Sequence, residues 1–271
     1  MASLKFDINQ KPHDEDEFVK WMEAKFGILN EQAKSNYDSN AARLLRAFQE
    51  HPFWKRIGEQ LKEWDTEYYK ENKVHLLTSE NLPVVVSKPY KSLLNKAYRK
   101  DCLNNDLFPN EPKKGWISPL SWYDKIHDII RTSFIVRYLD GVKFLDQKLS
   151  QVSNELGCKY ECSYEAHDDG YYAAHVAVLL ELSIVDMNWQ ETTHQIEVEI
   201  QITTELQEMV KSLLHKYYED NRRKIIPLDY KWQWDYHSEQ FVPNFLGHIA
   251  HYLEGMIVEI RDSQNKNNNI L

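Results

Sequence analysis

One segment of this sequence alternates strictly between apolar and polar side chains, a pattern typical of a half-buried β-strand. Its apolar positions are Ile196, Val198, Ile200 and Ile202, and its polar positions are Glu197, Glu199, Gln201 and Thr203. Because successive side chains of a strand point to opposite faces of a sheet, the pattern buries one face and places two carboxylates together on the other. A chain that contains this strand has to build a sheet and cover one side of it.

Further strand-like and helix-like segments surround this strand. The strand-like segments are 83–86, 133–139 and 176–182, and apolar residues recur at helical spacing in residues 1–80, 142–156, 206–217 and 244–262. The last helix carries an apolar stripe, Leu246, Ile249, Leu253, Met256, Ile257 and Ile260, which we expect to pack on the core. Strands in the middle of a chain, with helices before, between and after them, predict an α+β fold with a mixed β-sheet covered by helices.

The net charge limits the classes of partner. The chain has 33 basic and 42 acidic side chains, which give −9 at pH 7. Such a surface repels polyanions, so we expect no DNA binding. Basic residues are nevertheless concentrated in 88–100, at Lys113 and Lys114, and in 222–224, which leaves a local phosphate or RNA site open.

Hydropathy and cysteine content indicate the compartment. No apolar run approaches the roughly 20 residues needed to cross a bilayer, so we expect no membrane association. The three cysteines are an odd number in a chain too long to depend on disulfides, which favours a reducing compartment. We therefore expect a cytoplasmic protein.

Two groups of polar residues could carry chemistry, and each has an ordinary structural alternative. Glu197 and Glu199 share a strand face, and Asp128 precedes another strand; such carboxylates suit Mg²⁺, or are solvated acids on an edge strand. The segment with Lys88, Ser92, Lys96 and Arg99 could hold a polyphosphate, or is a solvated basic helix face.

Other signals are weaker. Tyr171 and Tyr172 follow Gly170, and an exposed tyrosine there could stack on a base, although tyrosines near a strand start more often pack in the core. His248 and His251 could be ligands, but packing is the commoner role for such histidines. Cys158 and Cys162 lack the second pair typical of a zinc site.

The order of these features along residues 84–219 resembles the synthetase domain of the RelA/SpoT family, the pyrophosphokinases that make the alarmone (p)ppGpp. The resemblance places Lys88, Ser92, Lys96, Arg99 and Arg131 at the ATP-binding positions, Asp128 and Glu199 at the catalytic and metal-binding carboxylates, and Tyr171, His175, Gln201 and His215 at the acceptor-binding positions. It implies a nucleotidyltransferase-like core, Mg²⁺ as cofactor and ATP as donor. The implied reaction is transfer of pyrophosphate from ATP to a ribose 3′-hydroxyl.

Departures from the family pattern bear on the acceptor. Residues 160–169 contain four acids and no Lys or Arg, where the family has a basic stretch that holds the phosphates of a guanine nucleotide. Thr203 stands in place of an arginine, and Ser133 occupies an arginine position for which Arg131 is the substitute. The motifs around Asp128 and Tyr171 look more like those of toxic small alarmone synthetases, some of which pyrophosphorylate the 3′ end of tRNA.

This resemblance implies a tRNA acceptor and leaves two alternatives open. The candidates to hold RNA phosphates are then Lys113, Lys114, Arg222, Arg223 and Lys224. The resemblance also implies an antitoxin protein as a partner. The first alternative is a (p)ppGpp or (p)ppApp synthetase that uses guanine or adenine nucleotides. The second is a catalytically inactive module that binds nucleotides or RNA.

The resemblance also divides the chain. We expect an N-terminal helical region over 1–80, a synthetase core over 81–225 and a C-terminal helical extension over 226–271 packed on that core. The segment before residue 84 is too short for the hydrolase domain of the long members and lacks its His-Asp metal pattern. We therefore expect a small, synthetase-only relative.

Overall fold

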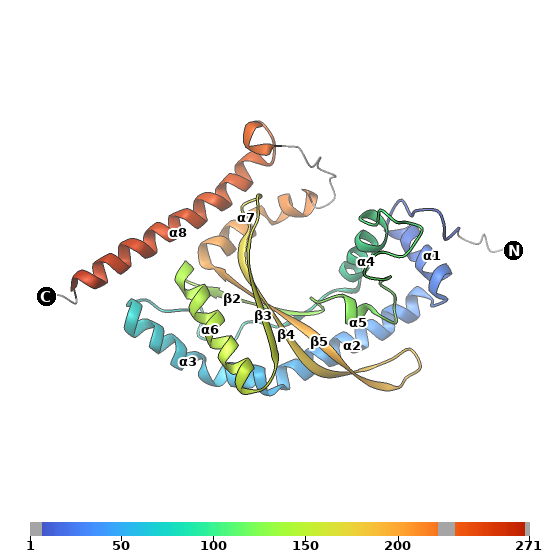
Figure 1. The fold of residues 1–271 in the computed structure, drawn as a ribbon, viewed down its shortest axis with the longest axis horizontal. Helices are drawn as coiled ribbons and strands as arrows, with labels where there is room; N and C mark the ends of the chain where they lie inside the picture. Colours follow the sequence, from blue (N-terminus) through green and yellow to red (C-terminus); the bar gives the residue numbers. More distant parts are fainter. Residues whose placement is uncertain (1–6, 222–230, 269–271) are drawn as a thin grey trace. The chain divides into compact units, whose positions relative to one another are not determined.

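A computed structural model of the chain describes residues 7–221 and 231–268, with side chains for all of these except 215–221 and 267–268. The fold is α+β, and a mixed five-stranded sheet has the strand order β1-β2-β5-β4-β3 (Figure 1). The strands are β1 (Val86–Ser87), β2 (Ile130–Val136), β3 (Lys159–Ala166), β4 (Tyr172–Val185) and β5 (Glu191–Thr204). The predicted fold class is confirmed.

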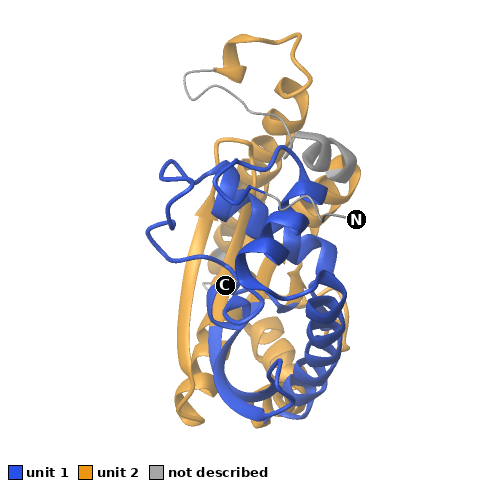
Figure 2. Cartoon of the chain, turned by 90° about the vertical axis from the view of Figure 1, so that its right-hand side faces the viewer, with its two compact units in different colours: residues 1–51, 85–131, 178–199 blue, residues 52–84, 132–177, 200–271 orange. Residues whose placement is uncertain are grey.

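The chain divides into two compact units, which Figure 2 shows in different colours. Unit 1 comprises residues 1–51, 85–131 and 178–199, and unit 2 comprises residues 52–84, 132–177 and 200–271. Each unit therefore collects segments that are far apart in the sequence. No helix in the described part of the chain combines the length and the apolar character needed to cross a membrane.

Unit 1 is built on aromatic packing between its helices. Those helices are α1 (Glu15–Phe26), α2 (Asn30–Glu50), α4 (Tyr90–Tyr98), the π-helix η1 (Arg99–Leu103) and α5 (Trp122–Lys125). Tyr37 of α2 is fully buried, and its ring contacts the rings of Tyr90, Trp122 and Tyr123. Helix α2 packs on α4 and on β1, so the N-terminal helices support the segment that begins at residue 86.

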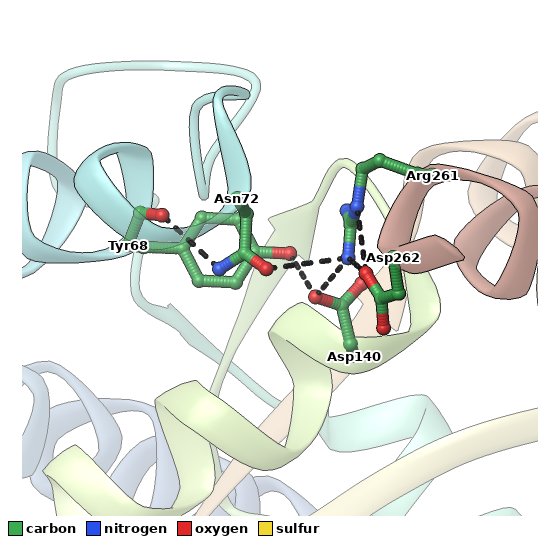
Figure 3. A network of polar contacts seen from close by, with 5 residues as sticks. All are labelled: Tyr68, Asn72, Asp140, Arg261 and Asp262. Carbon is green, nitrogen blue, oxygen red and sulfur yellow. Dashed lines mark hydrogen bonds and ion pairs between the residues drawn. The ribbon is translucent and has the colours of Figure 1, made fainter. Parts of the chain in front are cut away.

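Unit 2 joins three helices through a polar network. Its helices are α3 (Pro52–Asn72), α6 (Leu139–Glu155), α7 (Glu205–Asn221), the 3₁₀ turn η2 (Trp232–Trp234) and α8 (Phe241–Asn268). Asp140 Oδ2 accepts hydrogen bonds from Tyr68 Oη at 2.6 Å and from Arg261 Nη2 at 2.8 Å, and Arg261 Nη2 also donates to Asn72 Oδ1 at 3.3 Å (Figure 3). The network ties the C-terminal half of α8 to α3 and α6.

Two strands differ from the sequence-based expectation. Only Val86 of the expected buried strand 83–86 lies in β1, and the Val84 side chain is exposed. Strand β3 was not predicted. It is an edge strand, and no regular apolar alternation marks it because its side chains are exposed or half-buried on both faces.

Helix α8 is oriented differently from the expectation. Its apolar stripe is exposed, and the buried side of the helix instead carries Asn244, Gly247, Ala250 and Glu254. Small residues allow close approach of backbones, and polar residues can be buried where they find hydrogen-bond partners. The periodicity therefore predicted the helix correctly and its packed face incorrectly.

Candidate functional site

Asp128 lies between two lysines in unit 1. Its Oδ2 atom is 2.6 Å from Lys88 Nζ, and its Oδ1 atom is 2.8 Å from Lys96 Nζ. The Lys88 side chain is 9% exposed and the Asp128 side chain 13%. We call these three residues the Lys–Asp cluster. It brings together two predicted ATP-binding residues and one predicted catalytic carboxylate.

Electrostatics keep this cluster charged. Burial raises the pKa of Asp128, but the hydrogen bonds and charges of Lys88 and Lys96 outweigh burial and lower this pKa to about 2. Burial lowers the pKa of Lys88, and the charges of Lys96 and Arg131 lower it further. The hydrogen bond and charge of Asp128 partly offset this decrease. A dianionic or more highly charged ligand would relieve the repulsion among these cations.

Local structure fixes the Lys88 backbone. Its N–H donates to the Ile129 carbonyl at 2.8 Å, and its carbonyl accepts a hydrogen bond from the buried Tyr37 hydroxyl at 2.7 Å. The register of the short antiparallel pair β1–β2 places Ser87 opposite Ile130. Residues 88 and 128 are therefore held as neighbours by backbone pairing, and the side-chain contacts follow from it.

The other predicted ATP-binding residues lie on α4 and its end and on β2. Helical spacing separates Ser92 and Lys96 of α4 from each other and from Arg99, the residue that follows this helix. The Ser92 side chain is exposed. Arg99 Nε is buried and has no hydrogen-bond partner among the described residues. Arg131 opposes Val86 in the β1–β2 pair and is near enough to Lys88 for its charge to lower the Lys88 pKa. These groups are donors suited to an anion.

The second predicted carboxylate, Glu199, lies in β5, the neighbour of β2 in the sheet. Glu197 and Glu199 are half-buried on one face of β5. His127, the residue before Asp128, contacts Glu197, with His127 Nδ1 3.1 Å from Glu197 Oε2. The segment that carries Asp128 therefore touches the face of β5 that carries Glu199.

The donor set can be tested against a metal ion. No group of three or more His, Cys, Asp or Glu side chains suited to a metal occurs in the part of the chain that the structure describes. Mg²⁺ needs no such cage, because it commonly binds one or two carboxylates together with substrate phosphates. Ionised Asp128 and half-buried Glu199 fit that mode, in which phosphate oxygens complete the ligand set.

The predicted acceptor residues of unit 2 are centred on a tight turn, residues 167–172, which we call the Gly170 turn. The Gly170 N–H donates to the His167 carbonyl at 3.0 Å, and the His167 N–H donates to the Tyr171 carbonyl at 3.0 Å. Tyr171 Oη is 2.8 Å from His175 Nε2, and the Tyr171 ring lies 5.3 Å from the His167 ring. The structure thus brings Tyr171 and His175 together.

The remaining predicted residues lie on β5, on α7, in the loop after η1 and outside the described residues. Gln201 is half-buried on the Glu197–Glu199 face of β5. His215 belongs to α7, but its side chain lies outside the described residues, as do Arg222, Arg223 and Lys224 altogether. Lys113 and Lys114 are exposed in the loop that follows η1, and all three cysteines are free thiols.

Two residues near the cluster, Tyr37 and His127, were not singled out from the sequence, whereas Lys100 belongs to the predicted basic segment 88–100. Tyr37 holds the Lys88 carbonyl, and His127 binds Glu197. Partial burial and the charges of Lys96 and Lys114 lower the pKa of Lys100, so the positive charge continues from the cluster toward Lys114. The basic character of 88–100 pointed to Lys100, whereas no sequence pattern pointed to Tyr37.

Comparisons with known proteins place the fold. A scan against models of protein families gives no match, and a search of curated proteins finds no relative. Among solved structures, small alarmone synthetase 1 from Bacillus subtilis matches with a TM-score of 0.55 and 16% identity over 86% of this chain and 97% of that chain. A GTP pyrophosphokinase family protein from Streptococcus pneumoniae has a TM-score of 0.48 and 19% identity over 83% and 97%. The chain has the fold of a small alarmone synthetase.

Proposed function

We propose that this protein is a pyrophosphokinase that transfers the β,γ-pyrophosphate of ATP to a ribose 3′-hydroxyl and releases AMP. The observation that carries the proposal is the Lys–Asp cluster, in which Lys88 and Lys96 are held on the two oxygens of Asp128. Arg131 adds positive charge beside Lys88. Two lysines on one carboxylate, with a further cation beside Lys88, suit a polyphosphate, and the fold is that of a small alarmone synthetase.

In this scheme the ATP phosphates bind Lys88, Lys96, Arg99 and Arg131. The acceptor 3′-oxygen attacks the β-phosphorus, the bond between the β-phosphorus and the α,β-bridging oxygen breaks, and that oxygen leaves with AMP. The proton of the hydroxyl passes to the Glu199 carboxylate, which is half-buried on β5. Positioning and charge neutralisation carry most of the rate, because phosphoryl transfer asks little covalent chemistry of the protein.

Asp128 and Glu199 would hold Mg²⁺ together with the phosphates of ATP. When bound, the ion would neutralise charge on the phosphate oxygens. Because Asp128 stays ionised down to a pH of about 2, its carboxylate is available as a hard oxygen ligand at every physiological pH.

We propose the tRNA 3′ terminus as acceptor. Tyr171 offers an aromatic ring for stacking, and stacking tolerates any base because every base has a π-face. Strand β3 carries Glu161 and Glu165 and would repel the 5′-phosphates of a free guanine nucleotide. In tRNA the acceptor phosphates lie along the RNA, where Lys100 and Lys114 continue the positive charge.

A nucleotide acceptor is the second candidate. The fold relative from Bacillus subtilis is named an alarmone synthetase, which favours a guanine or adenine nucleotide in the same role. The third candidate, an inactive nucleotide-binding or RNA-binding module, is favoured by Thr203 in the place of an arginine. Against an inactive module stands the retention of Lys88, Lys96 and Asp128 in mutual contact.

The test is incubation of the protein with γ-³²P-labelled ATP, Mg²⁺ and either bulk tRNA or GDP, GTP and adenine nucleotides. We expect label in tRNA and one AMP released per transfer, and neither product with Asp128→Ala. Label confined to small nucleotides would replace tRNA by the nucleotide acceptor. Binding of ATP without AMP release would favour the inactive module.

Expression in cells separates the same alternatives. Modification of tRNA predicts growth arrest with halted translation and no accumulation of alarmone. A nucleotide acceptor predicts arrest with accumulation of (p)ppGpp or (p)ppApp. We also propose that a toxic activity of this kind is neutralised by an antitoxin protein, which is tested by co-expression with candidate genes and recovery of growth.

A further inference from the structure

The backbone of helix α8 touches the backbone of the Gly170 turn. A Cβ atom added at Gly247 would lie 2.9 Å from Gly170 C and 3.0 Å from Gly170 Cα. A Cβ atom added at Gly170 would lie 3.1 Å from both Gly247 Cα and His248 N, and Gly170 has a φ of 81°. Two facing glycines are needed here, since any side chain would force the helix and the turn apart.

His248 of α8 binds the turn on both sides of Tyr171. His248 Nε2 is 3.1 Å from the Asp168 carbonyl oxygen, and His248 Nδ1 is 2.8 Å from Tyr172 Oη. Because a carbonyl only accepts hydrogen bonds, the proton of the neutral imidazole belongs on Nε2, and Nδ1 then accepts from the Tyr172 hydroxyl. One ring therefore connects residue 168 with residue 172.

His251 covers the ring of Tyr172. The two ring centroids are 3.7 Å apart with an interplanar angle of 4°, and His251 lies one helical turn after His248. Burial lowers the pKa of His251, which favours the uncharged ring. The contact is a face-to-face stack, and His251 Nδ1 has no hydrogen-bond partner among the described residues.

We infer that α8 positions Tyr171 for the acceptor, with Gly247, His248 and His251 as positioning residues that act through Asp168, Gly170 and Tyr172. This inference rests on the proposed function, because it assigns Tyr171 to acceptor binding. The consecutive residues Tyr171 and Tyr172 have different neighbours. Tyr172 contacts His248 and His251 of α8, whereas Tyr171 Oη lies 2.8 Å from His175 Nε2. Anchoring Tyr172 on α8 fixes the direction of Tyr171, whose own ring lies among His167 and His175.

The consequence is a specific division of effects. A turn held in one conformation binds an acceptor without the entropic cost of ordering the turn first. Loosening the contact with α8 should raise the KM for the acceptor and leave the KM for ATP unchanged, because the ATP-binding residues are in unit 1. A merely structural role of α8 would raise both KM values or lower the folded fraction.

Two glycines of α8 provide a matched pair of variants. Gly247→Ala introduces a Cβ against the turn, whereas a Cβ at Gly255 would meet only Leu139 Cδ2 at 4.0 Å. Both substitutions add the same methyl group and the same gain in helix propensity. We expect about a 5- to 20-fold increase in acceptor KM for Gly247→Ala, an ATP KM within twofold of wild type, and no change for Gly255→Ala.

The histidine is tested by partial replacements. In His248→Asn an amide oxygen stands near the place of Nδ1 and can accept from Tyr172 Oη, whereas in His248→Ala both hydrogen bonds are lost. We expect His248→Ala to raise the acceptor KM about tenfold and His248→Asn to recover part of that loss. In the Tyr172→Phe background, His248→Ala should cost less, because one of its partners is already absent.

Hydrogen exchange of the peptide spanning 165–172 distinguishes failure of this inference from failure of the proposed function, since it requires no turnover. We expect exchange about tenfold faster in Gly247→Ala and His248→Ala than in wild type and Gly255→Ala. Unchanged exchange in both variants, or equal increases in the KM for ATP and for the acceptor, would overturn the inference. If wild type releases no AMP with any acceptor, the proposed function is overturned. The exchange rates would then still show whether α8 holds the Gly170 turn.

Discussion

The Lys–Asp cluster and the Gly170 turn are held in place by different forces. In the cluster, two ammonium groups bind one carboxylate at 2.6 and 2.8 Å. In the turn, a glycine-to-glycine backbone contact and the rings of Tyr172, His248 and His251 hold the chain. One region is organised by charge and the other by shape.

The difference predicts what each region tolerates. A charged cluster responds to the loss of a single charge, because a buried ion left without its partner is costly. A packed turn responds to added or removed volume, because interiors are close-packed. The four predictions that follow use this contrast, and they are ordered by the size of the effect.

Replacing Asp128 by Asn should have the largest effect. The variant leaves the buried Lys88 without the carboxylate that raises its pKa, and it removes a proposed ligand of Mg²⁺. We expect AMP formation to fall about 1,000-fold, within the range typical of a lost catalytic electrostatic group. Asp124→Asn, which removes an exposed carboxylate 3.1 Å from His194 Nδ1, should remain within twofold of wild type.

Retained activity in Asp128→Asn at wild-type melting temperature would contradict a catalytic role for the cluster. If Asp128→Asn loses both activity and folding, Lys96→Met distinguishes a catalytic role of the cluster from a structural one. That variant removes a partly exposed partner and should weaken ATP binding while leaving the protein folded.

The second prediction concerns stability in unit 2. Glu254 of α8 is 2% exposed and accepts a hydrogen bond from Thr204 Oγ1 at 2.7 Å. Burial raises the pKa of Glu254 to about 7, which the bond from Thr204 only partly opposes. The folded state therefore binds more protons than the unfolded state between a pH of about 4.5 and 7, and stability falls as pH rises through this window.

Glu254→Gln should remove this loss of stability. The amide oxygen can still accept from Thr204 Oγ1, and no charge has to be buried at pH 8. We expect the variant to unfold with a free energy about 2 kcal/mol higher than wild type at pH 8 and to show little advantage at pH 5. Glu259→Gln, an exposed position on the same helix, should not alter the pH profile. Parallel profiles for wild type and Glu254→Gln in urea would contradict the assignment.

The Lys–Asp cluster has the opposite pH dependence. The pKa of Asp128 is lowered in the folded state, so its contribution to stability is complete above a pH of about 4 and is lost as pH falls toward 2. At neutral pH the charge of Asp128 therefore stabilises the Lys–Asp cluster, whereas the buried Glu254 destabilises unit 2. Unfolding curves measured over a series of pH values distinguish the two contributions.

The third prediction addresses the aromatic platform. Tyr171→Ala should raise the acceptor KM about tenfold, in line with a lost base stack, and leave the KM for ATP unchanged. Tyr171→Phe keeps the ring and should stay within about threefold of wild type. Tyr164→Ala, which removes a more exposed tyrosine of β3, is the control. Equal losses in Tyr171→Phe and Tyr171→Ala would show that the hydroxyl, bonded to His175, matters more than stacking.

The smallest effect is expected at Lys114. If Lys114 contacts an RNA phosphate, Lys114→Gln should raise the KM for tRNA about twofold to threefold and lower the slope of its salt dependence by about one. Lys34→Gln removes an exposed lysine of α2 and should do neither. An unchanged salt slope in Lys114→Gln would remove this residue from the RNA surface.

The two regions also differ in how far the sequence predicts them. Lys88, Lys96 and Asp128 could each be singled out from short segments, because basic residues at helical spacing, an acid next to a strand and the resemblance all mark them locally; their mutual contact was not predicted. The contact of Gly170 with Gly247 joins residues that are far apart in the sequence, and no local pattern indicates it. Such contacts depend on the packing of a whole helix.

Helix α8 shows why local pattern can mislead. Its strongest apolar periodicity marks Ile249, Leu253 and Met256, which are exposed, while Gly247 and Glu254 face the rest of unit 2. Hydrophobic periodicity identifies a packed face only where burial is driven by apolar area. At α8 the contacts are backbone approach and hydrogen bonds, which periodicity does not detect.

The most direct test of the central claim is calorimetric titration of a non-hydrolysable ATP analogue into wild type, Lys88→Met and Tyr171→Ala. The account predicts that Lys88→Met weakens analogue binding at least tenfold, because the buried ammonium is lost from the phosphate site. It predicts that Tyr171→Ala binds the analogue within twofold of wild type. Equal weakening in the two variants, or wild-type affinity in Lys88→Met, would contradict the assignment of ATP to the Lys–Asp cluster and of the acceptor to the Gly170 turn.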